Sequence, residues 1–207
     1  ARVAAGAIAK LMLKELDIEI QSGICAIDGV EAKEYDFSLV SDSEIFALDK
    51  NVEQAQKDAI LAAKNKHNSV GGVALINVKN APIGLGEPLY FKLDSQIANA
   101  MMSINAVKAV EIGDGTLSSK VKGYDNNDQI RKDGFKTNHS GGMLGGISNG
   151  DDINVKVYFK STPSIFIKQE TVDIHNDEVD CELKGRHDPC VAVRGSVVAE
   201  SMMALVL

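Results

Sequence analysis

The chain has 207 residues, enough for one domain or two small ones with a buried core. Hydrophobic residues make up 44% and charged residues 25%, as in ordinary globular proteins. The 22 Lys and Arg against 29 Asp and Glu give a net charge of −7, which argues against a broad basic face for nucleic acid or anionic lipid. No apolar run approaches the ~20 residues of a membrane span. The three cysteines lack zinc-site spacing and cannot form a complete disulfide set. We therefore expect a cytoplasmic protein that binds no metal, nucleic acid or membrane.

Both ends of the chain lie in apolar helical patterns. The chain begins at Ala1 with no capping residue ahead of a helical pattern, and it stops at Leu207 inside another such run. Natural termini are usually polar and frayed. We therefore expect this sequence to be an internal piece of a longer protein.

Hydrophobic periodicity in the first half predicts helices and strands in alternation. Glu44 lies three residues after Ser41, the spacing of a capping box, and we expect this pair ahead of the second helix. In chain order the predicted elements are a helix ending near Leu16, a strand over 18–27 with a glycine break, a helix from Val52 to about Lys66, a strand over 70–78, and a helix over 93–109.

The second half predicts shorter elements. Its polar, aperiodic residues 116–138 predict a long mobile loop. The other predicted elements are strands over 110–112, 153–159, 164–174 and 179–183 and a last helix from Pro189 onward. Helices and strands are interspersed without regular β–α–β repeats, which favours an α+β fold in one domain over residues 1–207.

A glycine-rich segment over residues 137–150 is the first of three stretches that could carry chemistry. It contains the run Gly141-Gly142-Met143-Leu144-Gly145-Gly146, without the Lys-Ser/Thr of a P-loop. Glycine at this density lets a backbone approach a planar ring or a phosphate closely. A tight turn between packed elements explains the same composition, so both interpretations stay open.

The second stretch, Lys160–Ser164, combines one ammonium with three hydroxyls after a predicted strand. These groups on a turn could bind a phosphate, or could be an ordinary solvated strand end. In the third stretch, Asp188 before Pro189 has the pattern of a helix N-cap. Arg186 and His187 beside it suit an anionic ligand at a helix N-terminus. These two interpretations are compatible.

Four blocks of the sequence resemble the signatures of chorismate synthases. Residues 186–202, RHDPCVAVRGSVVAESM, resemble the C-terminal signature, and residues 137–150 resemble the family's T-N-H-S-G-G-x-L-G-G-I-S-x-G stretch. Residues 103–115 resemble a further block, and residues 1–6 resemble the tail of an Arg- and Ser-rich signature. The blocks follow the family's order across the whole chain, which makes the resemblance specific.

The resemblance implies the last step of the shikimate pathway. The family is a carbon–oxygen lyase that makes chorismate from 5-enolpyruvylshikimate 3-phosphate by a 1,4-anti elimination of phosphate. It requires reduced FMN without net redox change; the flavin transiently supplies electron density, and its N5 collects the ring proton. The family also implies layers of helices and antiparallel sheet of the β-α-β sandwich type. It implies a homotetramer whose flavin is reduced by NADPH or by a separate reductase.

The resemblance also assigns residues. Asp188 matches the catalytic carboxylate near flavin N5, where it would act through a proton relay. Lys160–Ser164 matches a segment that often reads K-P-T-S-S, so Ser161 and Pro163 depart from the usual order and the hydroxyl at 163 is lost. His139 receives no role. The positions that match FMN contacts are Asn105, Ala106, Gly145, Lys160, Ser161, Thr162, Pro163, Ser164 and Arg186.

The family's G-D-S-H-G signature, its two catalytic histidines and several substrate-binding arginines have no counterpart in this sequence. The substrate carries two carboxylates and a phosphate, so it requires a concentrated basic pocket. We therefore expect the 207 residues alone to have little or no synthase activity. Two further hypotheses are a flavin- or phosphate-binding module without catalysis and a scaffold that serves oligomerisation.

Overall fold

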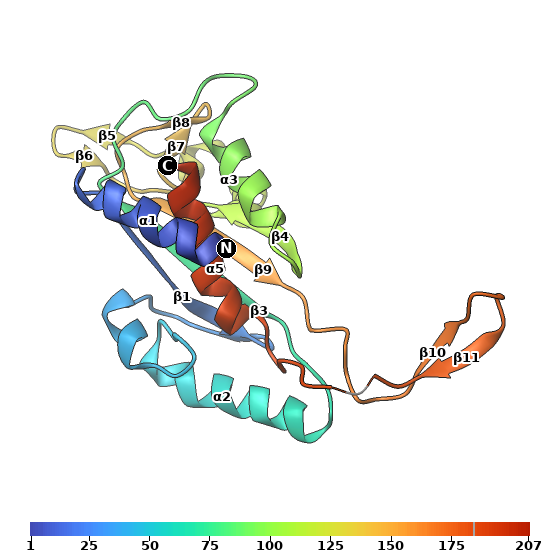
Figure 1. Cartoon of the computed structure of the whole chain (residues 1–207). Coiled ribbons are helices and arrows are strands. Elements are labelled where there is room, and N and C mark those ends of the chain that lie inside the picture. The colour runs from blue at the N-terminus through green and yellow to red at the C-terminus, as the bar shows by residue number, and fades with distance from the viewer. Residues whose placement is uncertain (184) are drawn as a thin grey trace.

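A five-stranded antiparallel sheet forms the centre of the chain in the computed structural model, which describes residues 1–183 and 185–207 (Figure 1). The strand order β2-β1-β3-β9-β4 is not sequential, so the sheet joins segments far apart in sequence. An α+β fold with an antiparallel sheet is thereby confirmed. The strands are β1 (Glu19–Ile27), β2 (Val30–Glu31), β3 (Gly72–Lys79), β4 (Val107–Ile112) and β9 (Ile153–Phe159).

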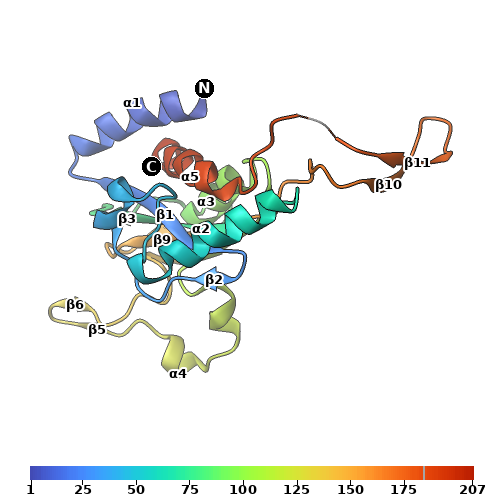
Figure 2. The ribbon, with the colours of Figure 1, turned by 90° about the horizontal axis from the view of Figure 1, so that it is seen from below.

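Helices cover one face of this sheet (Figures 1 and 2). α3 (Leu93–Met102) and α5 (Ala192–Val206) lie on the sheet, and α1 (Arg2–Lys14) packs against the outer side of α5. Alternate residues of β9 are fully buried in the core that these helices complete, as the period of two in the sequence predicts. The described residues thus supply one sheet layer and one helix layer of the expected sandwich. In the described part of the chain, no helix has both the length and the apolar character to cross a bilayer.

Close contact between α1 and α5 depends on small residues. A Cβ on Gly6 would lie 2.4 Å from the Cβ of Ser201, so glycine is required for this approach. Lys10 on α1 forms an ion pair with Glu200 on α5. The other carboxylate oxygen of Glu200 accepts a hydrogen bond of 2.7 Å from the Ser22 hydroxyl on β1. These bonds fix both helices to the sheet.

The helix α2 (Lys50–Asn65) lies beside β1 and β2, and its N-cap corrects the sequence-based expectation. The Asp49 side chain accepts a 2.8 Å hydrogen bond from the backbone N–H of Asn51. Ser41 instead lies in a 3₁₀ turn over Phe37–Asp42, and Glu44 forms an ion pair of 3.1 Å with Lys57. The predicted capping box is wrong because a cap must directly precede the first turn.

The predicted helix over 93–109 is also wrong beyond Met102. The chain leaves α3, passes Ala106 in a left-handed conformation with a φ of +71°, and enters β4 at Val107. Val107 pairs with Phe159 of β9 across the sheet. The β-branched residues of this stretch find a strand partner that the local helical spacing cannot reveal.

Short elements interrupt the predicted loop over residues 116–138. They are a 3₁₀ turn over Gly115–Ser119, α4 (Gly123–Asn126) and a hairpin of β5 (Ile130–Arg131) and β6 (Gly134–Phe135). Mobility of this stretch stays a prediction. A further hairpin, β7 (Met143–Leu144) with β8 (Ile147–Ser148), forms inside the glycine-rich segment.

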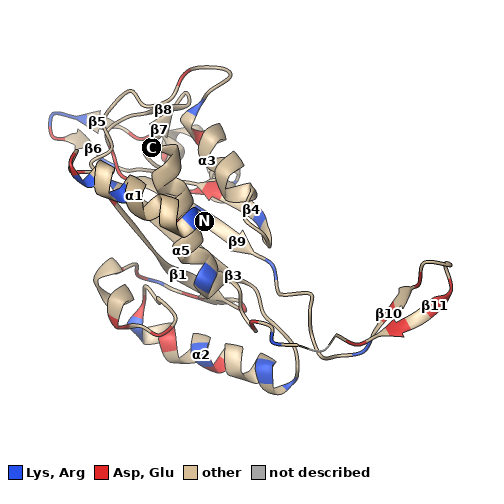
Figure 3. Cartoon of the chain, viewed as in Figure 1, with Lys and Arg blue, Asp and Glu red and all other residues tan. Residues whose placement is uncertain are grey.

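A third two-stranded hairpin, in addition to β5–β6 and β7–β8, extends away from the body of the molecule (Figures 1 and 2). β10 (Gln169–Val172) and β11 (Glu178–Cys181) are shorter than the predicted strands over 164–174 and 179–183. The colours of the ribbon in Figure 3 mark acidic residues along this hairpin and basic residues at the tip of β5–β6. The last helix begins at Ala192, with Val191 at its N-cap, so Asp188 does not cap it.

Candidate functional site

Two of the predicted site segments meet where β9 ends and α5 is about to begin. The Thr162 hydroxyl donates a 2.9 Å hydrogen bond to the backbone oxygen of Asp188. The Ser69 hydroxyl donates to the backbone oxygen of Thr162 at 2.6 Å, and the N–H of Val70 donates to Pro189 at 2.8 Å. The loop after α2 therefore holds Lys160–Ser164 and Arg186–Pro189 against each other.

A cavity of about 200 Å³ lies between these segments and the end of α2. Ser164, Arg186 and Asp188 line it, together with Lys64 and His67. The Phe166 ring lies 6.0 Å from the His67 ring and 5.9 Å from the His187 ring, between centroids. This first cavity is therefore lined by two cationic side chains, one carboxylate and the aromatic ring of Phe166.

A second cavity of about 410 Å³ opens between α1, α5 and the residues that follow α3. Asn105 lines it with Phe159, and two arginines, Arg2 and Arg194, do so as well. The Arg2 guanidinium donates to the backbone oxygen of Ser103 at 3.0 Å. This second cavity therefore presents an amide and two guanidinium groups.

Asp188 links the two cavities. Its Oδ2 lies 3.3 Å from Nη1 of Arg194, in the first turn of α5. Asp188 is the one carboxylate among the residues lining either cavity, against Arg2, Lys64, Arg186 and Arg194. The site is thus locally cationic although the chain carries a net charge of −7.

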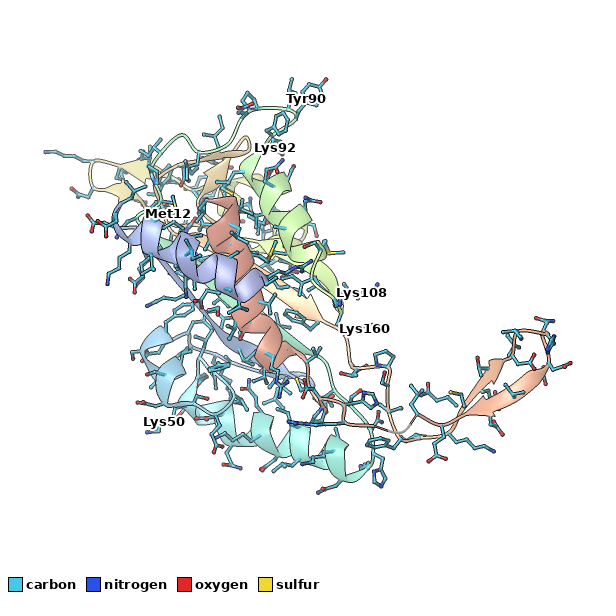
Figure 4. The ribbon with its side chains drawn as sticks, in the orientation of Figure 1. Met12, Lys50, Tyr90, Lys92, Lys108 and Lys160 are labelled. Carbon is cyan, nitrogen blue, oxygen red and sulfur yellow. The ribbon has the colours of Figure 1, made fainter. Side chains whose placement is uncertain are left out.

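Ala106 and Lys160, which the resemblance assigns to FMN contacts, are neighbours across the sheet. The N–H of Lys160 donates a 2.9 Å hydrogen bond to the backbone oxygen of Ala106. Figure 4 shows Lys160 at the end of β9 and Lys108 at the start of β4. The turn at Asn105-Ala106 and the segment that begins at Lys160 therefore lie together at this edge of the site.

Gly145 lies apart from the other predicted residues. With Gly146 it forms the β7–β8 turn, with φ values of +62° and +86°. The N–H of Leu93 donates to the Gly146 oxygen at 2.7 Å, which places the turn at the N-terminal end of α3. Figure 4 shows Lys92 at this end and Lys108 at the other. Because ten helical residues span about 15 Å, one ligand touching both Gly145 and Asn105 must lie extended along α3.

His139, which received no role from the sequence, is fixed by a carboxylate. Its Nδ1 lies 2.6 Å from Oδ2 of Asp114. A Cβ on Gly113 would lie 2.1 Å from the backbone oxygen of His139, so the two segments are in direct contact. Burial of Asp128 raises its pKa, but hydrogen bonds from Ser140, Thr137 and His139 outweigh burial and lower it. His139 thus belongs to the anchoring of the glycine-rich segment.

The sequence did not identify Arg2, Arg194, Lys64 and His67 as site residues. Arg2 and Arg194 occur inside two of the signature blocks, and that position was the available signal. Lys64 and His67 lie at the end of an ordinary amphipathic helix, where nothing in the local pattern points to a ligand.

Comparison with known proteins agrees with this geometry. The family model for chorismate synthase matches residues 1–207. Curated chorismate synthases of Aliarcobacter butzleri and Sulfurimonas denitrificans are 82% and 63% identical over 207 residues, and the chain spans 58% of their length. A crystal structure of chorismate synthase is similar with a TM-score of 0.81 at 30% identity, over 99% of this chain and 60% of that one. The chain belongs to the chorismate synthase family.

Proposed function

We propose that the protein containing this chain converts 5-enolpyruvylshikimate 3-phosphate to chorismate and inorganic phosphate, with reduced FMN as cofactor. Family membership supports this reaction, and one observation carries it: two linked cavities present four cationic side chains and a single carboxylate. Such a charge distribution suits a ligand with several anionic groups. The proposed substrate, with two carboxylates and a phosphate, is such a ligand.

The residues present fit FMN. The backbone N–H groups of Ser161, Thr162 and Ser164 donate to no other described residue, and Ser164 lines the same cavity as Lys64 and Arg186, which suits a phosphate group. Apart from Gly145 and its two chain neighbours, no described residue has an atom within 4 Å of a Cβ built on Gly145, which leaves room for a planar ring. We assign the cofactor to Asn105, Ala106, Gly145, Lys160–Ser164 and Arg186. When bound, reduced FMN supplies electron density while phosphate leaves.

The protein's own groups would stabilise charge and move a proton. As the carbon–oxygen bond to phosphate breaks and the ring loses a proton, negative charge accumulates on the leaving phosphate. Arg2 and Arg194 are placed to stabilise that charge. Arg194 holds Asp188 through Oδ2, which leaves Oδ1 to accept a proton in a relay.

The compartment, the subunit assembly and the source of electrons for the flavin are proposed from the same family membership. We place the protein in the cytoplasm, where three free cysteines suit a reducing compartment. Its partners would be further copies of itself in a homotetramer, and NADPH or a separate reductase would reduce the flavin.

Replacement of Asp188 tests the proposal in the full-length protein. We expect Asp188→Asn to lower turnover about 100-fold or more while FMN affinity, measured by flavin fluorescence quenching, stays unchanged. Asp58→Asn, on the exposed side of α2, is the matched control and should alter neither. Unchanged turnover in Asp188→Asn would reduce Asp188 to a structural role, and a joint loss of turnover and affinity would make it a binding residue.

The 207 residues should turn over no substrate by themselves, because the family's histidine-containing signature lies outside them. Substantial turnover by this chain alone with reduced FMN would overturn that expectation. Titration of the same chain with FMN separates the remaining possibilities. Quenching indicates a flavin-binding module, and no quenching indicates a scaffold.

A further inference from the structure

The β10–β11 hairpin is exposed and lacks the packing that would stabilise it. We define residues 165–183 as the acidic arm. Every residue of β10 and β11 is exposed except the half-buried Cys181, and Ile174 at the turn is 94% exposed. A two-stranded ribbon without a packed face is marginally stable in water. The acidic arm therefore requires a surface to pack against.

The charge of the acidic arm indicates what that surface carries. Between residues 166 and 183 there are six acidic side chains and one basic one, Lys168, which pairs with Asp180. A hollow of about 610 Å³ along the hairpin is lined by Glu170, Glu178 and Asp180 with Val172 and Val179. This surface is both anionic and partly apolar, so it suits a cationic protein surface with apolar side chains.

This chain carries such a surface on the opposite side of the molecule from the arm. We define residues 116–138 as the basic excursion. It holds five basic and three acidic side chains, and its basic side chains form no ion pair with any described residue. Leu117, Tyr124 and Ile130 are exposed among them. Figures 1 and 3 show the basic excursion and the acidic arm on opposite sides of the body, so the two cannot meet within one copy.

We propose that the acidic arm of one copy docks on the basic excursion of a second copy. Two-fold symmetry lets each copy give its arm and receive the other's, which closes the pair and prevents open filaments. Docking of the arm is separate from the proposed reaction and can be tested without measuring activity. It also connects assembly to the site, because the arm begins after Lys160–Ser164 and ends before Arg186–Asp188. A docked arm would hold both segments in place.

Charge reversal tests the contact in the full-length protein by sedimentation velocity. We expect Glu170→Lys with Glu178→Lys, and separately Lys132→Glu with Lys136→Glu, to weaken self-association at least about tenfold, because like charges then face each other. Combining all four substitutions should restore association. Glu34→Lys with Asp42→Lys, at exposed positions of the 32–48 segment, is the matched control and should leave association unchanged. Arm variants that behave like this control, or a combination that restores nothing, would overturn the proposal.

A cross-linking experiment covers the case in which other interfaces hold the assembly together. Cys181 on the arm is half-buried, whereas Cys25 and Cys190 are buried, so a thiol–amine cross-linker should start from Cys181. In a mixture of isotopically light and heavy subunits, we expect cross-links from Cys181 to Lys120, Lys122, Lys132 or Lys136 of the other copy. Cross-links from Cys181 only to lysines elsewhere, or only within one copy, would contradict the docking.

Discussion

The two faces of the five-stranded sheet differ in what covers them. Along β9, Ile153, Val155 and Val157 are fully buried in the main core, which α1, α3 and α5 complete. The residues between them, among them Lys156 and Tyr158, are only half-buried on the other face. Part of that second face is covered by residues 32–48, with a small cluster around Leu48 and Leu75. One face thus stabilises the fold, and the other keeps ionisable groups in partly dehydrated surroundings.

Those groups on the second face depend on one another. Around a cavity of about 260 Å³, Glu111 accepts hydrogen bonds from the Tyr158 hydroxyl and, at 2.8 Å, from the Thr116 hydroxyl. The Lys156 ammonium lies 5.7 Å from the centroid of the Tyr35 ring. Burial raises the pKa of the Cys25 thiol to about 12. The difference between the faces predicts that substitutions on the two faces lower the stability of the protein for different physical reasons.

The largest effect is expected on the face covered by helices. Ile76 on β3 is fully buried, and Ile76→Ala should lower the free energy of unfolding by about 2–5 kcal/mol through lost burial and the cavity left behind. Urea unfolding of the full-length protein measures this loss. Val172→Ala on the exposed hairpin removes apolar atoms without leaving a cavity and should cost far less. Equal losses would mean that the helix-covered face is not the main source of stability.

An intermediate effect is expected on the second face. Tyr158→Phe removes the hydroxyl donated to Glu111 and leaves one carboxylate oxygen without that partner, at a cost of about 1–2 kcal/mol. Tyr124 is 79% exposed, so Tyr124→Phe is a matched control with no expected loss. Identical urea midpoints for both variants would show that the polar cluster adds nothing to stability.

Prediction from the sequence was most accurate where the local pattern of residues alone determines the structural element. The alternation in residues 153–159 identified β9 with the observed bounds, because a strand covered on one side repeats every two residues. Prediction was wrong where a distant partner decided the structure. Ile104 continues the helical spacing of Ile97 and Met101, and all three are buried in the core, yet α3 ends at Met102 because β4 pairs with β9.

The candidate site shows the same limit. Residue types indicated Lys160–Ser164 and Arg186–Asp188 as two separate candidate stretches, whereas their contact rests on Ser69 and on a hydrogen bond from Thr162 to Asp188. Asp188 does not cap α5, which begins at Ala192, and instead forms an ion pair with Arg194 in its first turn. Contacts of this kind depend on the packing of three separate segments, and sequence spacing does not encode them.

The smallest effect is a pH dependence of stability that Glu111 gives to the second face. Burial raises the pKa of Glu111, but hydrogen bonds from Tyr158 and Thr116 outweigh burial and hold the pKa below its usual range. A carboxyl group whose pKa is lowered by folding adds stability above its unfolded pKa, and that stability is lost as the pH falls through the folded value.

Glu111→Gln should therefore be less stable than the wild-type protein near neutral pH, and the difference should shrink as the pH falls from about 7 to about 3. Urea midpoints across this range measure the difference, and Glu34→Gln at an exposed position is the control. Glutamine keeps the shape of the side chain but replaces one acceptor oxygen with an N–H donor, so it also loses a hydrogen bond from Tyr158 or Thr116. A difference that stays constant with pH would therefore come from lost hydrogen bonds alone. In that case the stability contributed by the second face would not depend on the protonation of Glu111. The two faces would then differ only in how deeply their side chains are buried.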